Sequence, residues 1–180
     1  MEPTRLSREL RTGRSPDLRR RRWVIGLSLF GAAVGGIVGA YQTGITRRLP
    51  DPPVGPFDSE RVDASDYAYK RMETPDGLQM TVTLAATAAL AGAGGEDRAR
   101  TKPHLPVLTT VKALYDVGTA MKLAQEEWNE NRALCAYCQA ATVSTVAAAA
   151  LSLPETVRAL NTIRDYGLRG APPVERLLPA

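Results

Sequence analysis

The two cysteines of the chain, Cys135 and Cys138, are separated by two residues. In the first turn of a helix this spacing puts both thiols on one face, close enough for a disulfide. A helix N-terminus favours the thiolate form, which is the nucleophile in disulfide exchange. We therefore interpret the pair as a candidate redox centre. Two alternatives remain: buried free thiols that act as small apolar residues, and a static disulfide, which would add little stability by closing so short a loop.

The composition argues against two other kinds of site. Two cysteines and one histidine are too few for a self-contained tetrahedral zinc or iron–sulfur site, so no metal is expected. The net charge of +4 reflects mostly the arginines of residues 1–22, which we interpret as a mobile basic arm. Since no aromatic residues are interleaved with these arginines, no nucleic acid is expected as a partner.

Four apolar stretches precede or contain the cysteine pair, at about 23–46, 78–95, 104–125 and 133–153. A bilayer core is spanned by about 20 apolar residues. We therefore predict an all-α fold, a four-helix transmembrane bundle with both termini cytoplasmic. A polar outer loop covers 47–77, and a polar cytoplasmic tail, 154–180, follows Pro154. The alternatives are a soluble Ala-rich bundle, which would need polar stripes, and a cleaved signal peptide at the first stretch.

The distribution of basic residues predicts the orientation. The arm, the 96–103 connection and the tail together carry 15 Lys or Arg, against 6 in the 47–77 loop and the 126–132 connection. The richer side is expected to be cytoplasmic. We thus predict a multi-pass protein of the cell (inner) membrane. Its cysteine pair would lie on the extracytoplasmic side, where dithiols can be oxidised.

Two further patterns concern packing inside the bundle. Gly31, Gly35 and Gly39 recur every four residues and form a ridge that permits close helix contact, either within the bundle or across a homodimer. Lys112 and Asp116 lie four residues apart in the third stretch, so they share a helix face and can form an ion pair. Because ionisable groups inside membranes are functional candidates, a proton path is the alternative.

This arrangement resembles the vitamin K epoxide reductase family, whose members carry Cys-x-x-Cys at the outer start of the last of four membrane helices. The family often shows Cys-x-x-Val-x-x-Ser-x-Tyr-Ala in its first outer loop. Residues 59–68 here read Ser-Glu-Arg-Val-Asp-Ala-Ser-Asp-Tyr-Ala. Val62, Ser65, Tyr67 and Ala68 match, and the resemblance extends over roughly residues 23–153.

The resemblance implies a membrane thiol–quinone oxidoreductase. Cys138 would face a quinone of the ubiquinone or menaquinone type, and Cys135 would exchange with a thiol partner. Ser65 would lie on the loop that caps the quinone cavity, unless its hydroxyl only forms a local turn. Thr142 stands where the vertebrate branch has a tyrosine and is the second candidate quinone-binding residue.

One departure from the family changes the expected electron path. Ser59 stands where the family has a loop cysteine, and the other loop cysteine is missing too. An internal thiol relay therefore cannot operate, and we expect direct exchange between Cys135 and an extracytoplasmic thioredoxin-like protein. The alternative is a non-catalytic membrane subunit that retains the fold and binds a partner through its outer loop.

Overall fold

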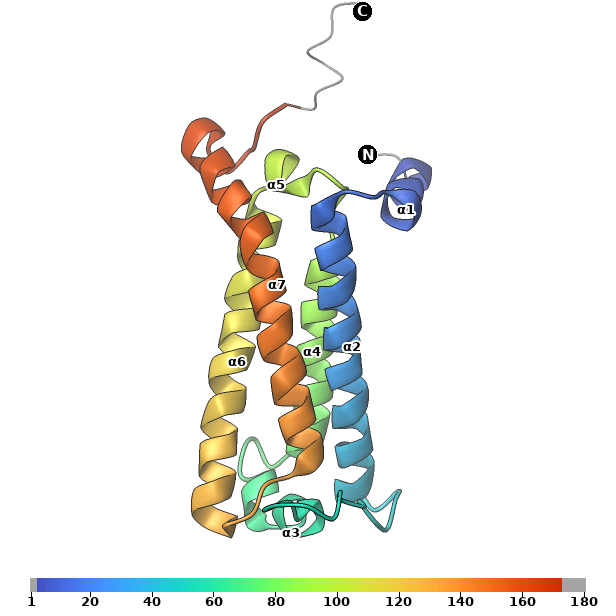
Figure 1. Cartoon of the computed structure of the whole chain (residues 1–180), viewed down its shortest axis with the longest axis vertical. Coiled ribbons are helices and arrows are strands. Elements are labelled where there is room, and N and C mark those ends of the chain that lie inside the picture. The colour runs from blue at the N-terminus through green and yellow to red at the C-terminus, as the bar shows by residue number, and fades with distance from the viewer. Residues whose placement is uncertain (1–2, 173–180) are drawn as a thin grey trace, which may run out of the picture.

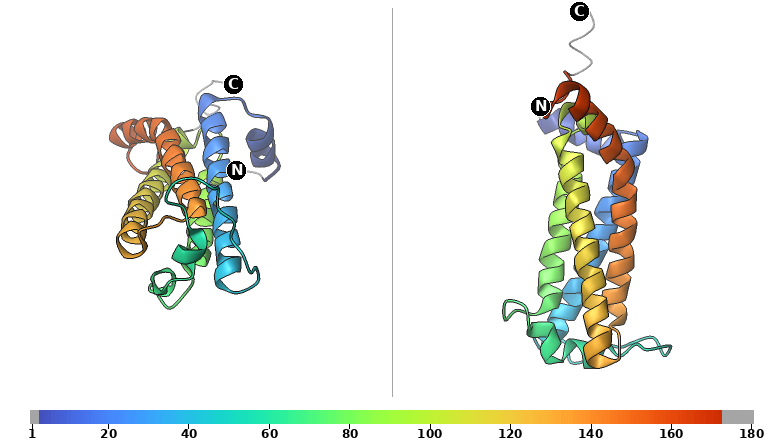
Figure 2. Two further views of the ribbon diagram at one scale, coloured as in Figure 1. Left: turned by 60° about the horizontal axis from the view of Figure 1, so that its bottom comes forward. Right: turned by 90° about the vertical axis from the view of Figure 1, so that its left-hand side faces the viewer.

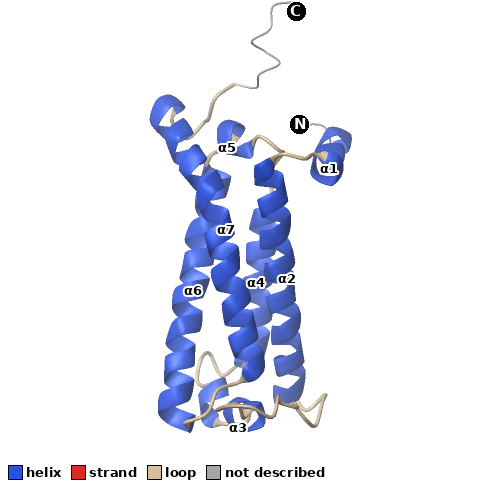
Figure 3. Ribbon diagram, in the orientation of Figure 1, coloured by secondary structure: helices blue, strands red, loops and turns tan. Residues whose placement is uncertain are grey.

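Four long helices run side by side in the computed structural model, which describes residues 3–172 (Figure 1). They are α2 (Pro16–Gln42), α4 (Asp76–Gly92), α6 (His104–Asn131) and α7 (Ala136–Tyr166). Within the described residues every regular element is helical (Figure 3), which confirms the all-α fold class. Each long helix contains most of one apolar stretch of the sequence.

Short helices lie at both ends of the bundle. α1 (Pro3–Thr12) and α5 (Arg98–Thr101) lie at the end where α2 begins, whereas α3 (Ser59–Asp63) and the 3-10 helix η1 (Asp66–Tyr69) lie at the opposite end. Figure 2 shows the connection between α2 and α4 lying across that opposite end. The cysteine pair, at the start of α7, is at the same end as this loop.

The outer surface of the bundle is strongly apolar. α2 and α7 are long and apolar enough to cross a membrane, a criterion that core helices of soluble proteins can also meet. Here, however, only 44% and 33% of their apolar stretches are buried. Large apolar side chains are exposed on all four long helices, among them Phe30, Ile37, Val82, Val111, Leu114, Val143 and Val157. Such extended apolar surface is typical of contact with a membrane or with another protein. That α4 and α6 also cross the membrane, and which end of the bundle faces outside, stay predictions.

The glycine ridge of α2 packs against α4. A Cβ added to Gly31 would lie 2.6 Å from the Leu84 side chain, and one added to Gly35 would lie 2.8 Å from the Gly77 carbonyl oxygen. Gly39 is buried in the same contact. The ridge therefore packs against another helix of the same chain. This is one of the two roles considered from the sequence, the other being a homodimer contact.

Two buried arginines satisfy the carbonyl groups at the end of α4. Arg21 donates to the carbonyl oxygens of Ala91 and Gly95, at 3.1 and 2.8 Å. Arg98 donates to the Ala91 carbonyl oxygen at 3.0 Å and forms a two-bond ion pair with Glu155. The Ala91 carbonyl lies in the last turn of α4, where helix carbonyls have no partner within the helix, so the two arginines cap this end.

Within the predicted mobile basic arm, the described residues are largely helical, over 3–12 and 16–22. The Ser15 Oγ accepts a hydrogen bond from the Leu18 backbone N–H at 3.3 Å, and Pro16 occupies the first helical position. Both are favourable signals for a helix start. The burial of Arg21 then fixes this first turn against α4.

The helix that contains the last predicted span does not end at Pro154, since α7 continues to Tyr166. A proline removes one backbone donor but does not by itself unfold the residues that follow. Here Glu155 pairs with Arg98, and the Thr156 hydroxyl donates to the Pro106 carbonyl oxygen at 3.0 Å. Figure 1 shows the final turns of α7 leaning away from the bundle axis.

Lys112 and Asp116 form the predicted ion pair, with Nζ to Oδ1 at 2.5 Å. The hydroxyls of Thr83 and Thr87, on α4, donate to the same carboxylate at 3.0 and 2.6 Å. The pair therefore ties α6 to α4 and is fully engaged in hydrogen bonds.

Candidate active site

Cys135 is the N-cap of α7, and its Sγ accepts a hydrogen bond from the Cys138 backbone N–H at 3.1 Å. Asn129 and Asn131, the polar residues just upstream, lie in the last turn of α6. Arg132 follows with a φ of 52°, which turns the chain sharply toward α7. The thiol itself thus takes the place of the usual capping oxygen, where a negative charge is favoured.

The two sulfur atoms lie close together, as their spacing predicted, but in different surroundings. The Cys135 side chain is fully buried, whereas Cys138 is partly exposed, and both thiols are free in this structure. Both Sγ atoms and one carboxylate oxygen of Asp63 lie within 4.8 Å of one another. This proximity is compatible with the formation and opening of a disulfide.

Ser59 lies directly against the start of α7. Its Oγ accepts a hydrogen bond from the Ala136 backbone N–H at 3.0 Å and donates to Asp51 Oδ1 at 2.5 Å. A backbone bridge between Phe57 and Leu134 holds the two segments together beside this contact. The loop position expected from the family motif is thus next to the cysteine pair, with a hydroxyl in place of a thiol.

Other loop contacts cover the pair. The Tyr67 hydroxyl donates to the Leu123 carbonyl oxygen at 2.9 Å, and the Tyr137 hydroxyl donates to the Pro50 carbonyl oxygen at 2.8 Å. Apolar side chains of the loop pack around Cys135, namely Leu49, Val62 and Tyr67. Cys135 is therefore closed off by the loop in this conformation.

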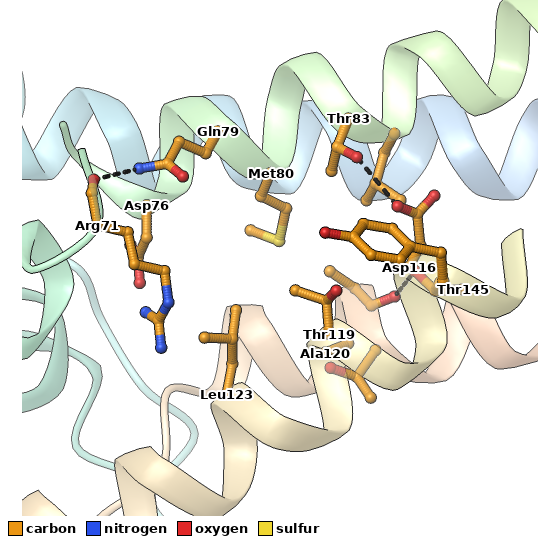
Figure 4. A pocket seen from close by; sticks show the side chains of 14 residues that line it. Arg71, Asp76, Gln79, Met80, Thr83, Asp116, Thr119, Ala120, Leu123 and Thr145 are labelled. Atoms are coloured by element: carbon orange, nitrogen blue, oxygen red, sulfur yellow. Dashed lines mark hydrogen bonds between the residues drawn. The ribbon is translucent and has the colours of Figure 1, made fainter. Parts of the chain in front are cut away.

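Cys138 lines a small cavity of about 50 Å³ between α4, α6 and α7. A neighbouring cavity of about 210 Å³ continues along the same helices. The two share five lining residues: Asp76, Met80, Ala120, Leu123 and Thr142. Figure 4 shows Met80 of α4 on one side of the larger cavity and Leu123 and Ala120 of α6 on the other. Cys138 thus borders a mostly apolar space inside the bundle.

The two predicted quinone-binding residues differ in their positions. Thr142 lines both cavities, and its hydroxyl donates to the Cys138 carbonyl oxygen at 2.8 Å. Ser65 is not among the residues that line either cavity, and its hydroxyl donates to the Val62 carbonyl oxygen at 2.6 Å. That bond is the local turn considered from the sequence, so a quinone contact at Ser65 stays a prediction.

Asp63 belongs to this site and was missed in the sequence. Its side chain is 1% exposed, and neither carboxylate oxygen has a hydrogen-bond partner among the described residues. Burial raises the pKa of Asp63 to about 7; the nearby Cys135 thiol opposes this rise, while Asp76 and Asp51 add to it. Asp58, Glu60 and Asp66 lie in the same loop, so no pattern in the sequence singles Asp63 out.

Glu127 is the second acidic group in contact with the pair. Its buried Oε2 accepts hydrogen bonds from the Cys135 backbone N–H and from Gln139 Nε2, both at 3.3 Å. The neighbouring Glu126 and Glu130 pair instead with Arg71 and Lys70 of the loop. Of the three glutamates before the cysteine pair, Glu127 is thus the one that contacts the backbone of Cys135.

An apolar helical bundle with a dithiol at the start of one helix is the architecture expected of a membrane-embedded thiol oxidoreductase. The chain belongs to the vitamin K epoxide reductase family, whose model matches residues 22–153. At the family level this supports a membrane oxidoreductase that couples thiols to quinones. Neither the comparison with curated proteins nor the comparison with solved structures found a match.

Proposed function

We propose that the Cys135–Cys138 pair passes two electrons between a partner dithiol and a quinone held beside Cys138. The observation that carries this proposal is the cavity at Cys138, which continues past Thr142 between three helices. Reduction of a quinone to a hydroquinone consumes two electrons and two protons, which is what a dithiol releases when it becomes a disulfide. The chemistry of the pair and of the proposed substrate therefore balances in either direction.

The cavity supports a quinone of the ubiquinone or menaquinone type as the substrate. Met80, Ala120 and Leu123 offer apolar contacts to a ring, and the Thr142 hydroxyl is a polar group within the lining. Tyr115 also lines the larger cavity, although its side chain is 69% exposed on the outside of α6. The cavity thus reaches the apolar outer surface, where a quinone dissolved in the bilayer would enter.

Within this proposal the two thiols have separate tasks. Cys138 reacts with the quinone because it lines the cavity, and Cys135 exchanges with an extracytoplasmic thioredoxin-like protein because it faces the loop. Ser59 cannot relay electrons, since a hydroxyl does not take part in disulfide exchange. Because Cys135 is 0% exposed, the 47–77 loop must move aside before the partner can reach it.

A second candidate function is a non-catalytic membrane subunit that binds its partner through the loop. The closed loop over Cys135, with Ser59 where a thiol would be, favours this alternative. Both candidates place the loop end on the extracytoplasmic side of the inner membrane, which the distribution of basic residues supports.

A trapping experiment in cells separates the two candidates. In the Cys138→Ser variant the resolving thiol is absent, so we expect a mixed disulfide between Cys135 and a thioredoxin-like extracytoplasmic protein. The double variant, Cys135→Ser with Cys138→Ser, is the control and should trap nothing. If Cys138→Ser captures no thiol partner and the wild-type protein passes no electrons to a quinone, the subunit function replaces the enzymatic one.

A further inference from the structure

Asp63 is the last residue of α3, and its side chain is buried, as is that of Val62. One of its carboxylate oxygens lies within 4.8 Å of both Cys135 Sγ and Cys138 Sγ. The carboxylate is fully covered, yet no described group donates a hydrogen bond to it. A buried polar group without a partner is costly, so its retention at this position calls for a chemical explanation.

The titratable groups around Asp63 come from every element packed against it. They are Cys135 and Cys138 at the start of α7, Asp76 on α4, Glu127 on α6, Tyr41 on α2 and Asp51 in the loop. The other three carboxylates have donors of their own: Ser59 for Asp51, Gln42 for Asp76, and the Cys135 backbone with Gln139 for Glu127. Among these four carboxylates, Asp63 alone has no hydrogen-bond donor among the described residues.

We propose that Asp63 is the proton acceptor and donor of the Cys135–Cys138 pair, a further catalytic residue that rests on the proposed redox function. When the pair is oxidised, the Cys135 thiol gives its proton to the Asp63 carboxylate, and the resulting thiolate forms the S–S bond with Cys138. The S–H bond of Cys138 breaks at the same time, so two electrons and the Cys138 proton pass to the quinone, and the second proton of the hydroquinone comes from the medium. When a partner dithiol reduces the disulfide, the partner thiolate attacks Cys135 Sγ and the S–S bond breaks. Cys138 then leaves as a thiolate and takes the proton back from the Asp63 carboxyl group. The second thiol of the partner forms the partner's own disulfide and releases Cys135, which takes up the proton of that thiol.

The burial of Asp63 suits this exchange. A general acid or base is most effective when its pKa lies near the working pH, and burial raises the pKa of Asp63 to about 7. Both protonation states are then populated near neutrality. An exposed aspartate with an ordinary pKa near 4 would be almost entirely ionised there and could not return the proton.

The test measures how fast dithiothreitol reduces the disulfide in the full-length protein in lipid nanodiscs, without any quinone. Asp63→Asn removes the proton carrier and keeps the side-chain shape, and Asp66→Asn, an exposed site on the same loop, is the matched control. The ratio of wild-type to variant rate cancels the titration of dithiothreitol itself. For Asp63→Asn we expect a ratio of at least about tenfold below pH 6, since general acid catalysis contributes typically 10²–10⁴-fold. The ratio should fall toward one above pH 8, where Asp63 has lost its proton.

A ratio for Asp63→Asn that does not change with pH, or equals that of Asp66→Asn, would overturn the assignment. The same preparations are then assayed for quinone reduction. If the pH-dependent ratio is found but no quinone is reduced, Asp63 keeps its role and the quinone half of the proposed function fails. A wild-type pair that dithiothreitol cannot reduce at any pH would contradict both.

Discussion

At the scale of single residues, the start of α7 determines how the cysteine pair can react. The Cys135 Sγ accepts a hydrogen bond from the Cys138 backbone N–H, a contact that favours a thiolate, whereas the burial of this sulfur beside Asp63 opposes one. Ser59 Oγ takes the next donor, the Ala136 N–H, and so ties the loop to the helix start. A small change at Ser59 should therefore alter both the cover over the pair and its chemistry.

Replacing Ser59 by cysteine should restore an internal relay thiol. Because Ser59 Oγ contacts the Ala136 backbone beside Cys135, the new thiol is expected to form a disulfide with Cys135. In the Cys138→Ser background this bond should compete with the trapped partner, which diagonal gels and mass-tagging of thiols would show. Ser65→Cys is the matched control, since the Ser65 hydroxyl is directed at the Val62 carbonyl oxygen. Equal behaviour of the two variants would show that the loop is placed differently.

Asp63 should also make stability depend on pH. Its folded pKa of about 7 is higher than the ordinary value of 3.8, so between these values the folded state binds more protons than the unfolded state. The free energy of unfolding should then fall as the pH rises from 4 to 7 and become level above pH 8. In Asp63→Asn this contribution, about 2–4 kcal/mol from the size of the shift, should be missing. Thermal unfolding in detergent at pH 5 and pH 8 measures it, and an unchanged pH dependence in the variant would contradict the burial of this carboxylate.

At the scale of elements, the apolar stretches predicted where the long helices run, because the apolar runs follow the helix period and length directly. The ends were predicted less well. The first turns of α2 and the continuation of α7 past Pro154 depend on Arg21, Arg98 and Glu155. These contacts join residues about 57–70 positions apart in the chain, which no local pattern reveals.

The close contact of α2 with α4 gives a prediction at this scale. In Gly35→Ala the new Cβ would lie 2.8 Å from the Gly77 carbonyl oxygen and 2.9 Å from the Thr81 backbone nitrogen, so the helices must move apart. Overpacking of this kind costs about 1–3 kcal/mol. Gly26→Ala, on the same helix with nothing within 4 Å, is the control and should leave stability unchanged or slightly raised. Detergent-resistance or thermal scans compare the two, and equal effects would contradict the packing of α2 against α4.

At the scale of the whole molecule, some residues of the site could be predicted from the sequence and others could not. Cys135 and Cys138 are recognised from their spacing, and Thr142, taken from the family resemblance, does line the cavity beside them. Asp63 was not predicted, because its role depends on where α3 folds against α7 rather than on its neighbours in the sequence. Local spacing therefore singled out the candidate redox pair, and only the assembled bundle identified its acidic neighbour.

The arrangement of the bundle allows the predicted sidedness to be tested. α1, α5 and the end of α7 lie at one end, and the loop with α3 lies at the other. In a background without Cys135 and Cys138, a cysteine at exposed Asp66 should react with an impermeant maleimide in cells whose outer envelope has been permeabilised. A cysteine at exposed Arg164, near the end of α7, should react only after the inner membrane is lysed. Labelling in the reverse pattern would place the pair in the cytoplasm and remove the oxidising compartment from the account.

The most direct measurement is quinone reduction by the purified protein. The full-length chain in nanodiscs is mixed without oxygen with dithiothreitol and a short-chain ubiquinone or menaquinone, and the quinone absorbance is followed. The account predicts that the wild-type protein reduces at least one of the two well above the uncatalysed rate, and that Cys135→Ser and Cys138→Ser each return it to that background. A wild-type rate equal to that of both cysteine variants with both quinones would contradict the claim that this pair transfers electrons to a quinone.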